Sequence, residues 1–138
     1  MVKYSLVGYD GSDSSRRAFQ FAVELARCSG GRVRVVSVLQ VTDGGADACA
    51  LMMSDSGAQR SRELLDELRA LVPDAETLVD VEVTLGSPGD VLLSQVQQHA
   101  IDHVVIGHTP RGTLARWLLG SVSSDVLARA QVPVTVVR

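Results

Sequence analysis

The sequence predicts an α/β fold in which a five-stranded parallel sheet carries helices on both faces. Stretches typical of strands alternate with stretches of helical periodicity along the whole chain. The connections between successive strands are long enough for crossover helices, and such an order produces parallel strands with helices packed on both faces. A chain of 138 residues has the length of one ordinary domain. We therefore expect a single domain over residues 1–138.

The first strand is expected over residues 3–9, an apolar run that ends at the turn-forming and helix-capping residues 10–13. A helix should follow over residues 14–28, because its apolar residues recur at spacings of three and four. Residues 29–31, Ser-Gly-Gly, end this helix, since glycine adopts the left-handed conformation common at helix ends. The second strand is expected over residues 32–41, which are rich in β-branched side chains.

Residues 42–57 have the weakest pattern in the chain, and we expect a long loop there, of functional or mobile character. The second helix is expected over residues 58–72, where leucines form an apolar stripe. The third strand is expected over residues 77–85, in which valines alternate with polar residues. Ser87 and Pro88 then provide a cap and a first helical residue for a third helix that reaches about His99.

A fourth strand over residues 103–107, a final helix over residues 121–130 and a last strand over residues 133–138 complete the predicted series. In open parallel sheets, ligands bind beyond the carboxyl ends of the strands, where the strand order reverses. The loops after the first and fourth strands are therefore the candidate site. These loops, residues 10–13 and 107–121, are also the two that carry the candidate anion-binding residues, glycines that allow close backbone approach and a helix start with free amides.

Composition and charge argue against several other classes of protein. A net charge of −3 and scattered arginines disfavour a nucleic-acid module, which would carry a basic stripe. No apolar run reaches the ~18 residues of a membrane span, and no signal peptide is evident, so we expect a cytoplasmic protein. The two cysteines lie far apart, so we expect reduced thiols. His99 and His103 have a spacing that could chelate a metal on a helix, but the helix is expected to end between them, so we expect no metal site.

Common phosphate-binding motifs do not match. The dinucleotide pattern GxGxxG is absent after the first strand. Residues 107–113 have the glycine spacing of a P-loop and its threonine, but they lack the lysine that contacts the phosphates. Residues 11–14, Gly-Ser-Asp-Ser, are similar to the end of the SGGxDS loop of AMP-forming ATP pyrophosphatases, although Tyr9 and Asp10 stand where that loop has Ser-Gly.

The chain resembles the universal stress protein family over nearly its whole length, from Asp10 to the closing PVTVV strand. ATP-binding members of that family carry a signature after the fourth strand: Gly, two residues, Gly, nine residues, and then Gly-Ser or Gly-Thr. Gly107, Gly120 and Ser121 match the first and last positions of this signature. The resemblance implies a Rossmann-like fold of the adenine-nucleotide alpha hydrolase type.

The second glycine of the signature is replaced here by Pro110, which has no N–H to donate to a phosphate. Arg111 follows it and could supply a charge-assisted hydrogen bond instead. Gly112, two residues after the expected position, could allow the loop a different path. We therefore include Arg111 and Gly112 in the predicted nucleotide site.

The resemblance also assigns roles to other residues. Asp10 is expected to accept hydrogen bonds from the adenosine part of a nucleotide, since Ser12 and Asp13 are better placed to cap the helix. Val38 corresponds to the residue whose backbone pairs with the adenine edge. The remaining nucleotide contacts are expected from Ile106 and Gly107 at the end of the fourth strand and from Gly120, Ser121 and Val122 at the last helix start.

The function implied by the resemblance is that of a stress-response sensor or regulator that binds an adenine nucleotide. The expected ligand is ATP, with or without Mg²⁺, or else AMP or ADP. A homodimer through the last strand, Pro133 to Arg138, is expected as well. No pairing of nucleophile and base is visible, so catalysis is not expected. A nucleotide-free dimeric adaptor, a slow ATPase and an AMP-forming enzyme remain as alternatives.

Overall fold

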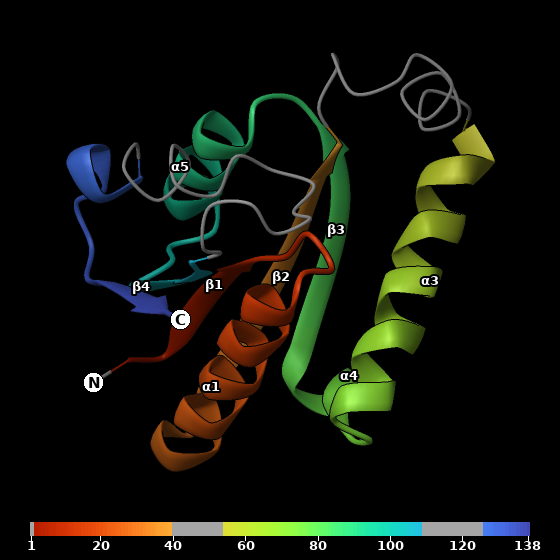
Figure 1. Cartoon of the computed structure of the whole chain (residues 1–138), viewed down its shortest axis with the longest axis horizontal. Helices are drawn as coiled ribbons and strands as arrows, with labels where there is room; N and C mark the ends of the chain where they lie inside the picture. Colours follow the sequence, from red (N-terminus) through yellow and green to blue (C-terminus); the bar gives the residue numbers. More distant parts are fainter. Residues whose placement is uncertain (1, 40–53, 109–125) are drawn as a thin grey trace.

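The computed structural model describes residues 2–39, 54–108 and 126–138, and it confirms the five-stranded parallel sheet (Figure 1). The strand order is β3-β2-β1-β4-β5, and all neighbouring strands are parallel. After β1 the chain builds β2 and β3 on one side and then crosses to β4 on the other, so the order reverses at β1. The strands are β1 (Tyr4–Gly8), β2 (Arg32–Leu39), β3 (Val79–Leu85), β4 (His103–Gly107) and β5 (Val134–Val137).

Helix α1 (Asp13–Ser29) begins and ends where the sequence predicts, to within one residue. Ser12 is its N-cap, because the hydroxyl of Ser12 accepts a hydrogen bond from the backbone N–H of Ser15 at 3.3 Å. Gly30 ends the helix in the left-handed conformation, with φ of 70°. The apolar stripe of this helix is buried against the sheet.

The other described helices are α3 (Ser54–Leu71), α4 (Ala75–Leu78), α5 (Pro88–Gln98) and a short helical segment over residues 126–129. The prediction of a loop over residues 42–57 was wrong at its end, since α3 already begins at Ser54. The prediction of a strand from residue 77 was wrong at its start, since Thr77 and Leu78 belong to α4. The N–H and the hydroxyl of Thr77 both donate to the carbonyl oxygen of Asp74, at 3.1 Å and 2.8 Å. These two local bonds hold one helical turn and delay the strand.

Two hydrophobic cores lie on opposite faces of the sheet. Helices α1 and α3 cover one face, where Val7, Val35 and Val105 pack against residues such as Phe19 and Leu68. Helix α5 and the segment 126–129 cover the other face (Figure 1). Successive strand residues alternate between the two cores, as expected for a sheet buried on both sides. The α5 face is formed by Leu6, Val36, Val38, Leu92, Ile101, Val104, Ile106 and Val126.

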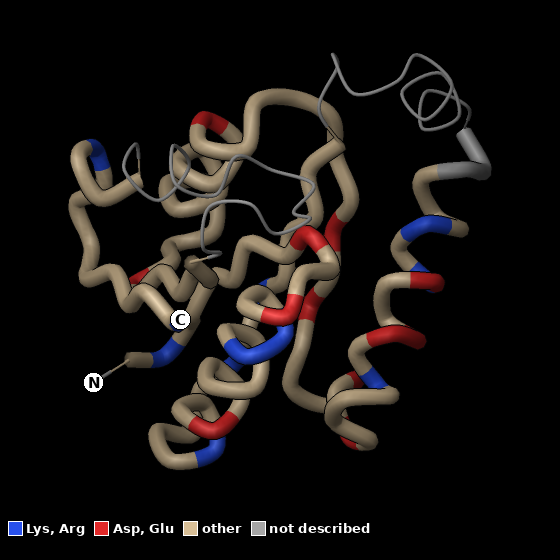
Figure 2. The backbone as a smooth tube through the Cα atoms, in the orientation of Figure 1, with Lys and Arg blue, Asp and Glu red and all other residues tan. Residues whose placement is uncertain are grey.

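Charged residues are dispersed over the described elements. Figure 2 shows Lys and Arg at separate points on α1, on α3 and near the two ends of the chain, with Asp and Glu interspersed. No basic stripe is formed by the described residues, consistent with the net charge of −3. None of the described helices has the length and apolar character needed to cross a membrane.

Candidate functional site

The carboxyl edge of the sheet is stepped, because β1 ends before its neighbour β2. Gly8 is the last residue of β1 and pairs with Val36, and the N–H of Tyr9 donates to the Val36 carbonyl oxygen at 3.0 Å. Strand β2 continues to Leu39. Val38 therefore lies two residues beyond the last β1 partner, at the place where the resemblance puts the adenine contact. Its side chain is buried in the core on the α5 face, so only its backbone faces this edge.

The loop after β1 is held by its own residues. The Oδ1 atom of Asp10 accepts a hydrogen bond from the N–H of Ser12 at 2.9 Å. Between these two residues, Gly11 has φ of 84°, a left-handed conformation that favours glycine. The turn fixes the direction in which the Asp10 carboxylate points, and it leaves capping of α1 to Ser12 as predicted.

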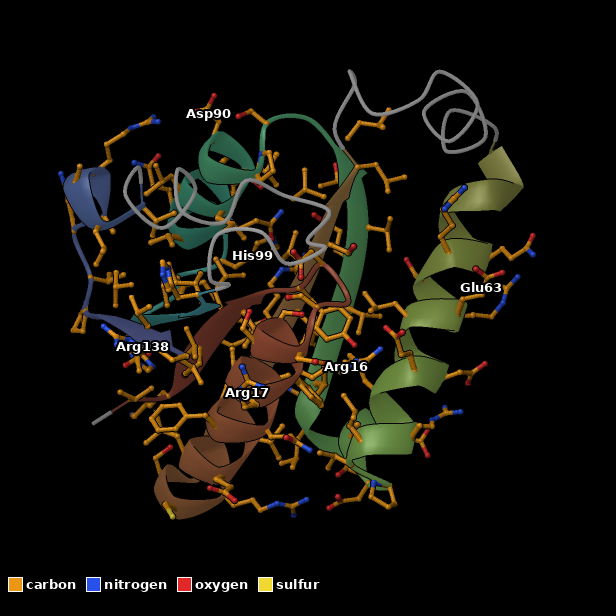
Figure 3. The ribbon with its side chains drawn as sticks, viewed as in Figure 1. Arg16, Arg17, Glu63, Asp90, His99 and Arg138 are labelled. Atoms are coloured by element: carbon orange, nitrogen blue, oxygen red, sulfur yellow. The ribbon has the colours of Figure 1, made fainter. Side chains whose placement is uncertain are left out.

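A cleft of about 470 Å³ opens beside this loop, on the face covered by α1 and α3. This volume is in the range of small-molecule sites. Figure 3 shows Arg16 on α1, between that helix and α3, and Glu63 on α3. The lining residues come from the β1 loop and α1, the ends of β2 and β3, and α3: Tyr9, Asp10, Gly11, Ser12, Arg16, Ser37, Leu39, Arg60, Glu63, Leu64, Glu67 and Val83.

Asp10 is the predicted site residue that the structure places in the cleft. The residue is 5% exposed. Although Oδ1 is paired with Ser12, Oδ2 is buried without a hydrogen-bond partner among the residues that the structure describes. Burying a carboxylate oxygen without a hydrogen-bond donor costs several kcal/mol in apolar surroundings. For a group that is already partly hydrogen-bonded, as Asp10 is, the cost is on the order of 1–3 kcal/mol. A ligand donor in the cleft would remove that cost.

Tyr9 is a second buried polar residue of the cleft, and the sequence reasoning did not include it in the site. The residue is 2% exposed, and its Oη atom has no hydrogen-bond partner within the described ranges. Burial raises the pKa of Tyr9 to about 12; the nearby Glu67 carboxylate acts in the same direction, and the Arg16 guanidinium opposes it. A tyrosine is already neutral at physiological pH, and this shift keeps the phenol neutral at higher pH as well, so Oη remains a hydrogen-bond donor.

The α3 wall of the cleft carries charge of both signs. Arg60, Glu63 and Glu67 line it from α3. Opposite them, Arg16 lies 3.5 Å from the exposed carboxylate of Asp13. These α3 residues were also missed by sequence reasoning. Their spacing in the sequence could have identified them. They lie three, four or seven residues from one another or from the buried Leu64 and Leu68, and such spacings place residues on the same face of a helix.

Gly107 ends β4 at the same level of the sheet as Tyr9, because Val105 pairs with Val7 two residues earlier. A Cβ atom on Gly107 would lie 2.5 Å from the carbonyl carbon of Ser14 and 2.6 Å from its oxygen. The glycine thus has a packing role, since it lets the first turn of α1 approach β4. Ile106 is buried on the α5 face, so only its backbone is at this edge.

Several predicted site residues lie outside the described residues, and their roles stay predictions. They are Arg111, Gly112, Gly120, Ser121 and Val122, together with Pro110, where the family signature is broken. The described part of the site therefore consists of the β1 loop, the ends of β2 and β4, and the cleft. This part can receive a ligand with hydrogen-bond donors at Asp10 and an acceptor at Tyr9.

The comparisons with known proteins agree on one family. The universal stress protein family matches residues 1–138. Universal stress protein MT1672 of Mycobacterium tuberculosis is 30% identical over 140 residues, covering 98% of this chain and 95% of that protein. The solved structure of UspA from Lactobacillus plantarum is 23% identical, with a TM-score of 0.76, and the match covers 99% of this chain and 98% of that chain.

A second solved structure is of a universal stress protein in complex with cAMP. It is 27% identical to this chain, with a TM-score of 0.68, over 99% of this chain and 97% of that one. The sequence match extends over all 138 residues, and the relatives share the five-stranded α/β architecture. This chain belongs to the universal stress protein family.

Proposed function

We propose that the chain binds an adenine nucleotide at the carboxyl edge of its sheet and acts as a sensor or regulator. The single observation that carries this proposal is the buried Oδ2 atom of Asp10, which has no partner among the described residues and lines the cleft. A carboxylate oxygen in this position is suited to accept hydrogen bonds from ribose hydroxyls or from an exocyclic amine. Both groups are present in adenosine.

The position of Asp10 supports the same ligand class. It follows β1, the strand at which the strand order reverses, and open α/β sheets bind ligands at that point. The related structure with cAMP bound shows that an adenine nucleotide is a ligand of a protein 27% identical to this one. For ATP in particular, we propose phosphate contacts from Arg111, Gly112, Gly120, Ser121 and Val122, and an adenine contact from the backbone of Val38.

A second candidate function is that of a dimeric adaptor, and the edge of the sheet favours it. Strand β5 is the last strand in the order, and Val136 on it is 38% exposed. An exposed edge strand offers unpaired backbone groups to a second chain. We propose a homodimer through residues 133–138, which is compatible with either function. Cytoplasmic location is proposed with both.

The test is a titration of the purified protein with ATP, ADP, AMP and cAMP by calorimetry, with and without Mg²⁺, after any bound nucleotide has been removed and identified. Asp10→Asn should weaken binding at least about tenfold, because it removes the charge that strengthens the ligand hydrogen bonds. Asp13→Asn is the matched control. It makes the same change on an exposed carboxylate outside the cleft lining, and it should leave affinity unchanged.

Two outcomes would contradict the proposal. Absence of heat with all four nucleotides at millimolar concentration would leave the nucleotide-free adaptor as the better function. Equal affinity of wild type, Asp10→Asn and Asp13→Asn would mean that the nucleotide binds away from the β1 loop.

A further inference from the structure

We propose that the cleft between α1 and α3 receives the nucleoside part of the ligand, and that the Tyr9 hydroxyl determines specificity by donating a hydrogen bond to it. This inference rests on the proposed nucleotide binding and names a contact within that site. It places the uncharged base and ribose against Tyr9, Asp10 and α3. The phosphates would then lie outside the cleft.

The hydroxyl of Tyr9 lies near the Glu67 carboxylate and the Arg16 guanidinium, but it makes no hydrogen bond of ordinary length to the described residues. The ring packs with the core on the α1/α3 face, a role that phenylalanine would fill equally well. The Oη atom is buried without a partner, and such a group destabilises the folded protein relative to an apolar ring of the same shape. A hydroxyl that lowers stability and lines a cleft is a candidate ligand contact.

The charges of the lining favour an uncharged ligand group over a phosphate. Three carboxylates (Asp10, Glu63 and Glu67) face two guanidiniums (Arg16 and Arg60), which leaves one more negative than positive charge. Arg16 is also paired with Asp13. A phosphate group would meet net repulsion here, whereas a base and a ribose would not.

Tyr9 and Asp10 together present complementary hydrogen-bonding groups. The phenol of Tyr9 is protonated at physiological pH, as an ordinary tyrosine is, so Oη can donate to a ring nitrogen or a ribose oxygen. Asp10 Oδ2 accepts from a hydroxyl or an amine. A nucleoside carries both kinds of group within a few ångströms of each other. A ligand that lacks the acceptor would leave the phenol unpaired, and this loss is the basis of specificity.

The experiment compares Tyr9→Phe with wild type for three ligands, namely adenosine, AMP and ATP, and measures thermal unfolding of the free protein. We expect affinity to fall by about five- to tenfold for each ligand, since one neutral hydrogen bond is lost. The reduction should be the same for all three, because the contact is with the part that they share. The free variant should unfold about 3 °C higher, because an unpaired buried hydroxyl is removed.

Tyr4→Phe is the matched control, because Tyr4 is the first residue of β1, the strand that Tyr9 directly follows, and its hydroxyl is paired. The Oη atom of Tyr4 donates to Asp80 Oδ2 at 2.9 Å. This variant should lower the unfolding temperature and leave all three affinities unchanged. The two substitutions remove the same atom. A rise in unfolding temperature for one variant and a fall for the other would therefore distinguish an unpaired hydroxyl from a paired one.

Three results would overturn the inference, and they differ from failure of nucleotide binding itself. A lower unfolding temperature for Tyr9→Phe with unchanged affinity would mean that the phenol bonds to Glu67 in the free protein. A reduction seen with AMP and ATP but absent with adenosine would place Tyr9 against a phosphate. Unchanged affinity and unchanged stability would assign the hydroxyl no role. If wild type binds none of the three ligands, the proposed function fails and this inference fails with it.

Discussion

Two clusters of polar residues on opposite faces of the sheet differ in how completely they are paired. On the α5 face, Arg34, Glu82 and Gln95 form a closed network. Arg34 donates to Gln95 Oε1 at 2.7 Å and to Glu82 Oε1 at 3.0 Å, and Gln95 donates to Glu82 Oε2 at 2.6 Å. On the α1/α3 face, Tyr9 and Asp10 each keep one buried oxygen without a partner in the described part of the chain.

The difference separates polar residues that hold the fold from polar residues that we propose to contact a ligand. Each member of the closed network joins two elements, since β2, β3 and α5 each contribute one side chain. Buried polar groups stabilise a fold only when their hydrogen bonds are made. The cleft cluster does not meet this condition in the free protein. We therefore expect substitutions in the network to change stability, and substitutions in the cleft to change binding.

The largest expected effect is that of Gly107→Ala, which would disturb the cleft through its α1 wall. The new Cβ would lie 2.5 Å from the backbone of Ser14, and no side-chain rotation can relieve a contact with backbone. We expect a loss of about 3 kcal/mol in the free energy of unfolding. Nucleotide affinity should also fall, because the first turn of α1 must move. Denaturant unfolding and calorimetric titration would measure the two effects.

Gly31→Ala is the control for this variant. Its Cβ would lie 2.5 Å from the carbonyl oxygen of Lys3, a similar clash at the other end of the sheet. This variant should lose comparable stability but bind nucleotide normally at temperatures where it remains folded. If both variants lost affinity equally, Gly107 would have no special relation to the cleft.

Arg34→Ala should have the next largest effect, and it tests the closed network. The Arg34 side chain is 11% exposed, and its removal leaves Gln95 and Glu82 without a shared donor. Because Glu82 is partly exposed, we expect a loss of about 2 kcal/mol, less than for a fully buried pair. Nucleotide affinity should not change, since none of the three network residues lines the cleft.

Arg32→Ala provides the comparison on the same strand. Arg32 pairs with Asp80 at 2.9 Å, but both side chains are about half exposed. Its loss should lower stability by less than about 1 kcal/mol. If Arg34→Ala and Arg32→Ala lowered the free energy of unfolding equally, the network would stabilise the fold no more than a surface ion pair does.

The fold could be predicted from the sequence because its signals are local. Alternating valines, glycine at Gly30 and proline at Pro88 mark individual elements, and their order then requires a parallel sheet. Helix α4 was missed because one turn held by two hydrogen bonds to Asp74 leaves no periodicity in the sequence. Elements of several turns or several strand residues are predictable; single turns are not.

The site could be predicted only in part, for a different physical reason. Asp10 follows a buried strand at the point of order reversal, so its position alone indicates a ligand. Whether the hydroxyl of Tyr9 is paired depends on residues of α3 such as Glu67, which meet it only in three dimensions. Gly107 shows the converse. The sequence predicted that Gly107 lets the backbone approach a ligand, whereas the structure shows that it lets the backbone of Ser14 approach β4.

The smallest expected effect concerns His103, which lies on the α1/α3 face but is fully paired. Its Nδ1 lies 3.2 Å from Ser5 Oγ and its Nε2 lies 2.7 Å from Thr135 Oγ1, so the ring links β1, β4 and β5. Both ring nitrogens of His103 thus have a partner, whereas Tyr9 and Asp10 at the cleft each keep a buried oxygen without one among the described residues. Burial lowers the pKa of His103, with the Asp102 carboxylate opposing this effect.

A histidine whose pKa is lower in the folded state than in the unfolded state makes stability depend on pH with a definite sign. The unfolded chain binds the proton first as the pH falls below about 6.5, so stability is full above that value and declines below it. His103→Gln should flatten this part of the profile while keeping a side chain that can bond to both hydroxyls. Unfolding midpoints between pH 8 and pH 5 would measure the slope. An unchanged slope in the variant would mean that another group titrates. The contacts of His103 with Ser5 and Thr135 would then contribute nothing to the pH dependence of stability.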